Sequence, residues 1–280
     1  MPTLLHQGCS LSYQVSGNGP PVIFIQGVGI HGCGWNPQTD ALSSGFRCIS
    51  FDNCGIGRSQ PVAGPLSVER MAQDTLALMD AEGWNSAHVV GHSLGGLIAQ
   101  FLALKQRERV RSLTLICTFS DGRVPVRMSG RVIWIASRTH IGTRRMRRNA
   151  FVELVLPKAI RAGADRDELA AEVARVIGHD LADQPPITMS QLGAMRAYDA
   201  TPRLGELLGM PTLVISASED IIAPAWAGRK LAQCIPGARF IEIQDAAHGL
   251  PMHSPLRVNP LLIEHLSRSE SDMRLSAASL

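Results

Sequence analysis

One segment constrains the fold of this chain more than any other: residues 89–96, which read VVGHSLGG. A run of β-branched residues ends in a G-x-S-x-G pattern centred on Ser93, and helical periodicity begins at Leu94. So abrupt a turn from strand to helix strains the backbone of its central residue, and the residues two positions away must be tiny. Gly91 and Gly95 meet that requirement, because glycine has no Cβ to clash. The following helix would aim its N-terminal amides at the surroundings of the serine oxygen, so Ser93 is a candidate nucleophile.

The order of the predicted elements indicates the fold class. Several short runs are rich in β-branched residues and continuously apolar, which is typical of strands covered on both faces. Helical patterns lie between them, at residues 67–82 and 94–106. Alternating strands and helices predict an α/β protein with a mostly parallel sheet flanked by helices. The predicted strands are residues 21–25, 47–51, 87–90, 112–116, 212–216 and 239–243.

This alternation is interrupted between residues 121 and 205. That stretch has few strand-like runs, several helical ones, and many arginines. We interpret residues 121–205 as a helical cap inserted into a core formed by residues 1–120 and 206–266. Residues 267–280 are rich in serine and alanine and are predicted to form a frayed, flexible tail.

From about residue 13 to residue 266 the sequence resembles the α/β-hydrolase superfamily. The resemblance rests on the turn at Ser93 and on two later loops, each of which follows a predicted strand. Asp220, followed by apolar residues and Pro224, is similar to the acid loop of the family, and His248 lies in a loop similar to its histidine loop. The resemblance implies a capped α/β-hydrolase sheet and a catalytic triad of Ser93, Asp220 and His248 in the usual chain order. Glu219 is the neighbouring rival for the acid, and we expect it to face solvent.

The same resemblance implies an oxyanion hole made of backbone amides. Its donors would be the amides of Val28, which follows an early strand, and of Leu94. Gln26 stands where many relatives carry histidine, which affects only the packing of this loop. Trp35 is a candidate either for lining the substrate pocket or for filling the core. Nucleophile, base and oxyanion donors all come from the chain, so no cofactor is implied, and no metal-ligand spacing is present.

A serine at the turn argues against relatives that use aspartate there, such as haloalkane dehalogenases and epoxide hydrolases. Hydrolysis of esters, lactones, thioesters or carbon–carbon bonds, perhydrolysis and acyl transfer remain open. The leading hypothesis is hydrolysis of a small carboxylic ester or lactone through an acyl-enzyme, by analogy with the fold. One alternative is a carbon–carbon bond hydrolase whose acidic ring-cleavage substrate suits the arginine-rich cap; the other is a ligand receptor with vestigial hydrolysis. For the four arginines Arg144, Arg145, Arg147 and Arg148, we expect a solvated helical face rather than an anion site.

Composition limits the partners and the compartment. The formal charge of +3 is too small to indicate binding to nucleic acid by itself. The sequence contains no run of 18 apolar residues, so no membrane-spanning helix is predicted. The N-terminus lacks the pattern of a signal peptide, and six scattered cysteines form no C-x-x-C pair. We therefore expect reduced thiols, a cytoplasmic protein and a small-molecule substrate, with neither nucleic acid nor membrane as a partner.

Overall fold

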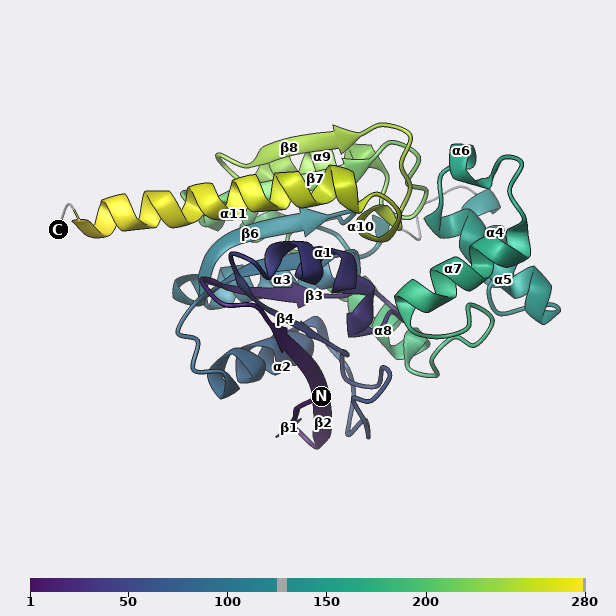
Figure 1. The fold of residues 1–280 in the computed structure, drawn as a ribbon, viewed down its shortest axis with the longest axis horizontal. Helices are drawn as coiled ribbons and strands as arrows, with labels where there is room; N and C mark the ends of the chain where they lie inside the picture. Colours follow the sequence, from purple (N-terminus) through teal and green to yellow (C-terminus); the bar gives the residue numbers. More distant parts are fainter. Residues whose placement is uncertain (125–129, 279–280) are drawn as a thin grey trace.

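The computed structural model describes residues 1–124 and 130–278 (Figure 1). Its strands are β1 (Thr3–His6), β2 (Cys9–Ser16), β3 (Pro21–Ile25), β4 (Arg47–Phe51), β5 (Ala87–His92), β6 (Val110–Ile116), β7 (Thr212–Ala217) and β8 (Arg239–Ile243). Its α-helices are α1 (Asn36–Leu42), α2 (Val68–Ala81), α3 (Leu94–Lys105), α4 (Gly130–Arg138), α5 (Arg144–Val155), α6 (Lys158–Arg161), α7 (Arg166–Ile177), α8 (Thr188–Arg196), α9 (Ala225–Cys234), α10 (Leu250–His253) and α11 (Pro255–Ala278). Short 3-10 helices are η1 (Gly32–Trp35), η2 (Arg107–Arg109) and η4 (Thr201–Leu207).

The strands form one mixed sheet in the order β1-β2-β4-β3-β5-β6-β7-β8. The six strands from β4 to β8 in this order run parallel, whereas β1 and β2 are antiparallel to their neighbours. This arrangement confirms the predicted mostly parallel α/β sheet. Strands β1 and β2 were not predicted, because polar and apolar residues alternate in β2 and β1 has only two apolar residues, so neither forms a long apolar run.

Helices cover both faces of the sheet, as the apolar strands require. In β3, Val22 and Phe24 pack with α1 and α11 on one face, while Ile23 and Ile25 pack with α2, α3 and α9 on the other. Figure 1 shows α11 running along the first face. A parallel strand buried on both faces needs apolar residues at every position, which explains the unbroken run in the sequence.

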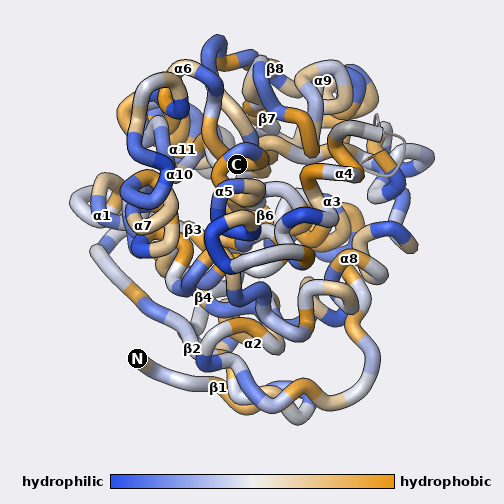
Figure 2. The backbone as a smooth tube through the Cα atoms, turned by 90° about the vertical axis from the view of Figure 1, so that its right-hand side faces the viewer, coloured by the Kyte–Doolittle hydropathy of each residue, from blue (hydrophilic) through white to orange (hydrophobic). Residues whose placement is uncertain are grey.

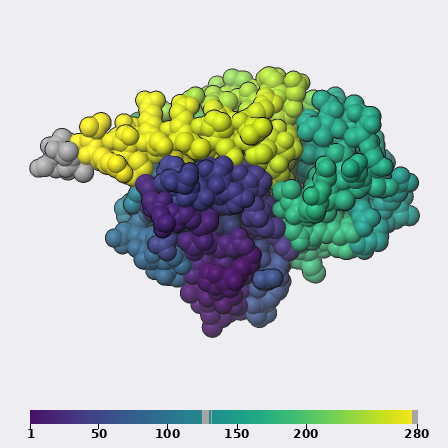
Figure 3. All heavy atoms as spheres, viewed as in Figure 1, coloured from purple at the N-terminus to yellow at the C-terminus, as the bar shows by residue number. Residues whose placement is uncertain are grey.

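Helices α4 to α8 form an insert between β6 and β7, at the end of the sheet where the parallel strands finish (Figure 1). The predicted helical insert is therefore confirmed, and we call it the cap. Figure 3 shows it, in teal and green, as one flank of the molecule, and Figure 2 views that flank, where hydrophobic and hydrophilic segments are interleaved. The segments that lead into and out of the cap are joined by an isolated antiparallel β-bridge between the backbones of Asp121 and Asp199. The last cap helix, α8, ends at Arg196. The next element, η4, packs Leu204 and Leu207 into the hydrophobic core beneath the sheet, so it belongs to the core rather than to the cap.

The predicted frayed tail from residue 267 is wrong over most of its length, because α11 continues to Ala278; residues 279 and 280 lie outside the described part. Ser269 is buried, and Glu270 Oε1 lies 3.0 Å from His88 Nε2 and 2.7 Å from Arg111 Nη1. Burial lowers the pKa of His88 to about 4, so its imidazole is neutral at physiological pH. None of the described helices, α11 included, is long and apolar enough to cross a membrane.

The anchor at Glu270 predicts an asymmetry between two carboxylates of α11. Replacing Glu270 by alanine should lower the free energy of unfolding by about 1.5–3 kcal/mol, because charged hydrogen bonds to His88 and Arg111 are lost beneath the helix. Glu264, which pairs with Arg239 in solvent, is the matched control, and its replacement by alanine should cost at most about 1 kcal/mol. Urea unfolding of both variants measures the difference, and equal losses would contradict the anchoring role of Glu270.

Candidate active site

Ser93 occupies the sharp turn between β5 and α3, with φ 54° and ψ −119°. Close backbone packing around it leaves no space for side chains at the flanking glycines. A Cβ at Gly91 would lie 2.3 Å from the carbonyl oxygen of Gly95, and a Cβ at Gly95 would lie 2.1 Å from that of Ile25. Any other residue at these positions would push α3 away from the sheet, so the steric reason inferred from the sequence holds in the structure.

The structure brings Ser93, His248 and Asp220 together in a continuous hydrogen-bonded row. The Oγ atom of Ser93 lies 3.1 Å from Nε2 of His248, and Nδ1 of His248 lies 2.8 Å from Oδ2 of Asp220. All three residues are buried, and they follow β5, β8 and β7 respectively. The other oxygen of Asp220 accepts hydrogen bonds of 2.8 Å from the amides of Ile222 and Ala223, which orients the carboxylate toward the imidazole. Such a row can pass a proton from a hydroxyl to an imidazole that a carboxylate holds in place.

Glu219, the sequence-level rival of Asp220, is engaged elsewhere. Its Oε2 atom accepts a hydrogen bond of 2.9 Å from the backbone amide of Lys158, the first residue of α6 in the cap. The side chain is half-buried against the cap, which differs from the solvent-facing position expected from the sequence. Because it binds an amide at the start of a helix, Glu219 is satisfied without His248.

Three further residues contact the row, and sequence reasoning did not assign them a place there. The Thr118 hydroxyl donates a 2.7 Å hydrogen bond to the carbonyl oxygen of Ser93. Burial and, to a smaller extent, the neighbouring Asp220 carboxylate raise the pKa of Cys117 well above its usual value, so this thiol stays protonated. The Nε2 atom of His92 lies 2.8 Å from the carbonyl oxygen of His248, and burial lowers the pKa of His92 to about 3. Residues 117 and 118 directly follow β6, and this position at the carboxyl end of a strand is the sequence feature that could have placed them beside the row.

The loop after β3, residues 26–30, lies directly against the serine, and we call it the Val28 loop. A Cβ at Gly27 would lie 3.0 Å from Cβ of Ser93, which places the backbone of this loop beside the hydroxyl. Among the described residues, neither the amide of Val28 nor that of Leu94 has a hydrogen-bond acceptor. Two donors without an internal acceptor, on either side of a buried serine, are what an oxyanion site requires.

A cavity of about 350 Å³ separates this row from the cap, and its lining is mainly apolar. Ser93, His92 and His248 form part of the lining. The apolar side chains come from the Val28 loop (Val28, Ile30), α4 (Val132, Ile133, Ala136), α5 (Phe151, Leu154, Val155), α8 (Leu192, Met195) and the core (Ile222, Met252). This cavity lies where Figure 1 shows the cap helices facing the ends of the strands. Its size and composition suit a small organic molecule.

Two apolar residues, Trp35 and Ile135, do not line this cavity. Trp35 is fully buried in the core, with its ring 5.1 Å from that of Phe24 and 6.3 Å from that of His92, and it does not belong to the described lining. Ile135 packs in the apolar core of the cap, whereas Val132 and Leu154, from the same stretch of cap helices, line the cavity. Helical periodicity predicts an apolar face, but it does not say which turn of that face meets the cavity and which meets a neighbouring helix.

Three of the four clustered arginines of the cap are directed at carboxylates of the cap itself. The ion pairs are Arg144 with Asp180 and Asp183, Arg145 with Asp167, and Arg148 with Asp180. Hydrogen bonding to Arg148 holds the pKa of Asp180 well below its usual range. Arg144, Arg145, Arg147 and Arg148 are all absent from the described lining of the cavity, whose arginine is Arg196.

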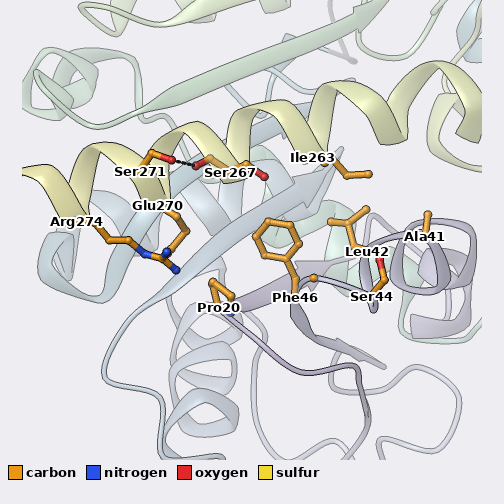
Figure 4. A pocket seen from close by; sticks show the side chains of 11 residues that line it. Pro20, Ala41, Leu42, Ser44, Phe46, Ile263, Ser267, Glu270, Ser271 and Arg274 are labelled. Carbon is orange, nitrogen blue, oxygen red and sulfur yellow. Dashed lines mark hydrogen bonds between the residues drawn. The ribbon is translucent and has the colours of Figure 1, made fainter.

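Another hollow of the surface lies apart from the row of Ser93, His248 and Asp220. Figure 4 shows a second hollow, of about 360 Å³, between α11 and the turn that precedes β4. Phe46, Glu270 and Arg274 are among its lining residues, whereas Ser93, Asp220 and His248 are not. Within the described ranges, no group of three histidine, cysteine or acidic side chains is arranged to hold a metal ion. The cavity beneath the cap is therefore the candidate active site.

Comparison with known proteins identifies the family to which this fold belongs. A family model for the alpha/beta hydrolase fold matches residues 20–255. The sequence is 32% identical to a protein of Azorhizobium caulinodans named as a carbamate hydrolase, RutD, over 90% of this chain and 93% of that protein. An enol-lactonase from Burkholderia xenovorans has a similar structure (27% identity, TM-score 0.79, covering 95% of this chain and 100% of that one). So has a thermophilic esterase from Thermogutta terrifontis (28% identity, TM-score 0.78, covering 95% and 97%). This chain belongs to the alpha/beta hydrolase family.

Proposed function

We propose that the protein is a serine hydrolase that cleaves a small, uncharged carboxylic ester or lactone through an acyl-enzyme. Ser93 is the nucleophile, His248 the general base and Asp220 the carboxylate that orients the imidazole. The observation that carries the proposal is the buried row from Ser93 Oγ through His248 to Asp220, with distances of 3.1 and 2.8 Å. It opens into a cavity large enough for such a substrate.

Acylation begins when Ser93 Oγ attacks the carbonyl carbon of the substrate. The hydroxyl proton passes to Nε2 of His248, and the C=O π electrons move onto the carbonyl oxygen. The Nδ1–H group of His248 donates a hydrogen bond to the Asp220 carboxylate. This bond selects the tautomer with a free lone pair on Nε2 and stabilises the imidazolium that forms.

Charge on the carbonyl oxygen is stabilised by the amides of Val28 and Leu94, which have no acceptor within the described structure. The tetrahedral intermediate then collapses: the bond from carbon to the leaving oxygen breaks, and His248 returns its proton to that oxygen. With an ester the alcohol departs, and with a lactone it stays attached to the acyl chain. Water, activated by the same imidazole, hydrolyses the acyl-enzyme and regenerates Ser93.

The substrate class follows from the cavity lining and from the relatives. Apolar side chains from α4, α5 and α8 surround the serine, which favours an uncharged acyl group over a charged one. Of the four cap arginines on which the acidic-substrate alternative depended, Arg144, Arg145 and Arg148 are paired with cap carboxylates, and all four lie outside the described lining. Two structural relatives are named as an enol-lactonase and an esterase, which supports ester and lactone chemistry.

The first prediction concerns the nucleophile. Ser93→Ala should abolish covalent labelling by a fluorophosphonate and reduce turnover by several orders of magnitude, because no other group can form the acyl-enzyme. Labelling and ester hydrolysis by the folded variant measure this. Labelling or most of the activity retained in that variant would overturn the assignment. In the wild-type protein, one slow turnover with retained product would instead indicate a ligand receptor.

A second prediction separates the two neighbouring carboxylates. Asp220→Asn should reduce kcat by about 10⁴-fold, because the imidazole then favours the wrong tautomer. Glu219→Gln should leave kcat nearly unchanged, since its amide oxygen can still accept from the amide of Lys158. Steady-state kinetics of the two variants on one ester provide the measurement, and reversed results would assign the acid to Glu219.

The third prediction concerns selectivity in the cap. Leu154→Ala should enlarge the cavity and shift the preference toward bulkier acyl groups, because Leu154 lines it. Ile135→Ala is the matched control: this side chain is buried in the cap core, so its loss should reduce stability and leave the acyl preference unchanged. Ratios of kcat/KM across a series of acyl lengths measure the effect. Identical profiles for both variants would contradict the selective role of Leu154.

A further inference from the structure

Hydrogen bonds from the cap reach the backbone of loops that form the candidate site. The amide of Gly249, next to His248, donates a 2.9 Å hydrogen bond to the carbonyl oxygen of Val155 in α5. The amide of Gly29, next to Val28, donates one of 2.9 Å to Oε1 of Gln191 in α8. The cap therefore does more than cover the cavity, because it bonds directly to the backbone on both sides of the serine.

The contacts at Gly29 restrain the Val28 loop on both sides of one residue. In addition to its amide, the carbonyl oxygen of Gly29 is held, 2.9 Å from Nε2 of His179, the second residue beyond the end of α7. Gly29 has φ +76°, a conformation that side-chain-bearing residues rarely adopt. Its amide shares a peptide plane with the carbonyl of Val28, so the bond to Gln191 restricts ψ of Val28. The amide of Val28 lies one peptide earlier, and its direction depends on the backbone conformation that these contacts restrain.

Stability alone does not account for a glutamine at position 191. The side chain is completely buried, and within the described structure its Nε2 atom has no hydrogen-bond partner. Burying an amide with unsatisfied donors is unfavourable, whereas an apolar side chain of similar shape would pack there without that penalty. Gln191 lies on the face of α8 that carries Thr188 and Met195, both of which line the cavity. In the part of the chain that the structure describes, the one hydrogen bond of the Gln191 side chain is the one that its Oε1 atom accepts from the amide of Gly29.

We propose that Gln191 is a positioning residue that orients the amide of Val28 toward the developing oxyanion. This inference rests on the proposed function. It means that a cap helix, rather than the core alone, completes the oxyanion hole, and that the hole loses its geometry when α8 is displaced from the Val28 loop. The bond to Gln191 then contributes more to the transition state, where the oxyanion exists, than to the bound ester.

The test compares two fully buried glutamines. Gln191→Met keeps the shape and removes the acceptor, and it should lower kcat on a p-nitrophenyl ester about five- to tenfold while KM changes less than about twofold. Affinity for a trifluoromethyl ketone, whose hemiketal oxyanion occupies the hole, should fall by the same factor. Gln38→Met is the matched control: Gln38 bonds to Pro251 and Asn259, away from the Val28 loop, so kcat and ketone affinity should stay within about twofold of wild type.

The proposal is overturned if Gln191→Met keeps wild-type kcat, or if kcat falls without an equal loss of ketone affinity. It is also overturned if Gln38→Met shows the same losses, because the effect is then one of general destabilisation. Should Gln191→Met fail to fold, His179→Phe decides: it removes the half-buried donor to Gly29 and should weaken ketone binding about two- to threefold, and unchanged binding refutes the proposal. Wild-type protein that no fluorophosphonate labels at Ser93 would instead refute the proposed function.

Discussion

The close approach of α3 to β3 at Gly95 is the constraint on which the candidate site depends. A Cβ at this position would lie 2.1 Å from the carbonyl oxygen of Ile25, so only glycine lets the helix begin directly behind Ser93. The serine then adopts φ 54°, a conformation that is unfavourable by itself and is maintained by the packed sheet around it. With the turn held, Ser93 Oγ reaches His248 in the loop that follows β8, and His248 in turn reaches Asp220 in the loop that follows β7.

The core and the cap divide the work of the site between them. The core supplies the polar groups at the carboxyl ends of its parallel strands, which is the usual place for ligands in such sheets. The cap supplies most of the apolar lining above the serine, and electrostatic interactions are stronger in an apolar cavity from which a bound substrate displaces water. Hydrogen bonds from cap to loop join the two parts, so the shape of the cavity and the geometry of the proposed oxyanion hole depend on one another.

Features that depend on local sterics could be predicted from the sequence, whereas features that depend on distant partners could not. The turn at Ser93 is encoded by glycines two residues away, and the buried strands by continuous apolar runs. By contrast, Gly29 and Gln191 are 162 residues apart, and a glutamine within a helix carries no signal of its partner. The C-terminal segment appears frayed by composition, yet Glu270 anchors it to His88, 182 residues earlier. Trp35 could fill the core or line the pocket, and only the positions of Phe24 and His92 decide between them.

The central claim, that hydrolysis proceeds through an ester on Ser93, can be tested by trapping the intermediate. Wild-type protein mixed with an activated ester and quenched in acid within milliseconds should carry one acyl group, and peptide mass spectrometry should locate it on Ser93. The amount of adduct should equal a burst of released alcohol. Rapid turnover with no adduct, or with the acyl group on another residue, would contradict the account.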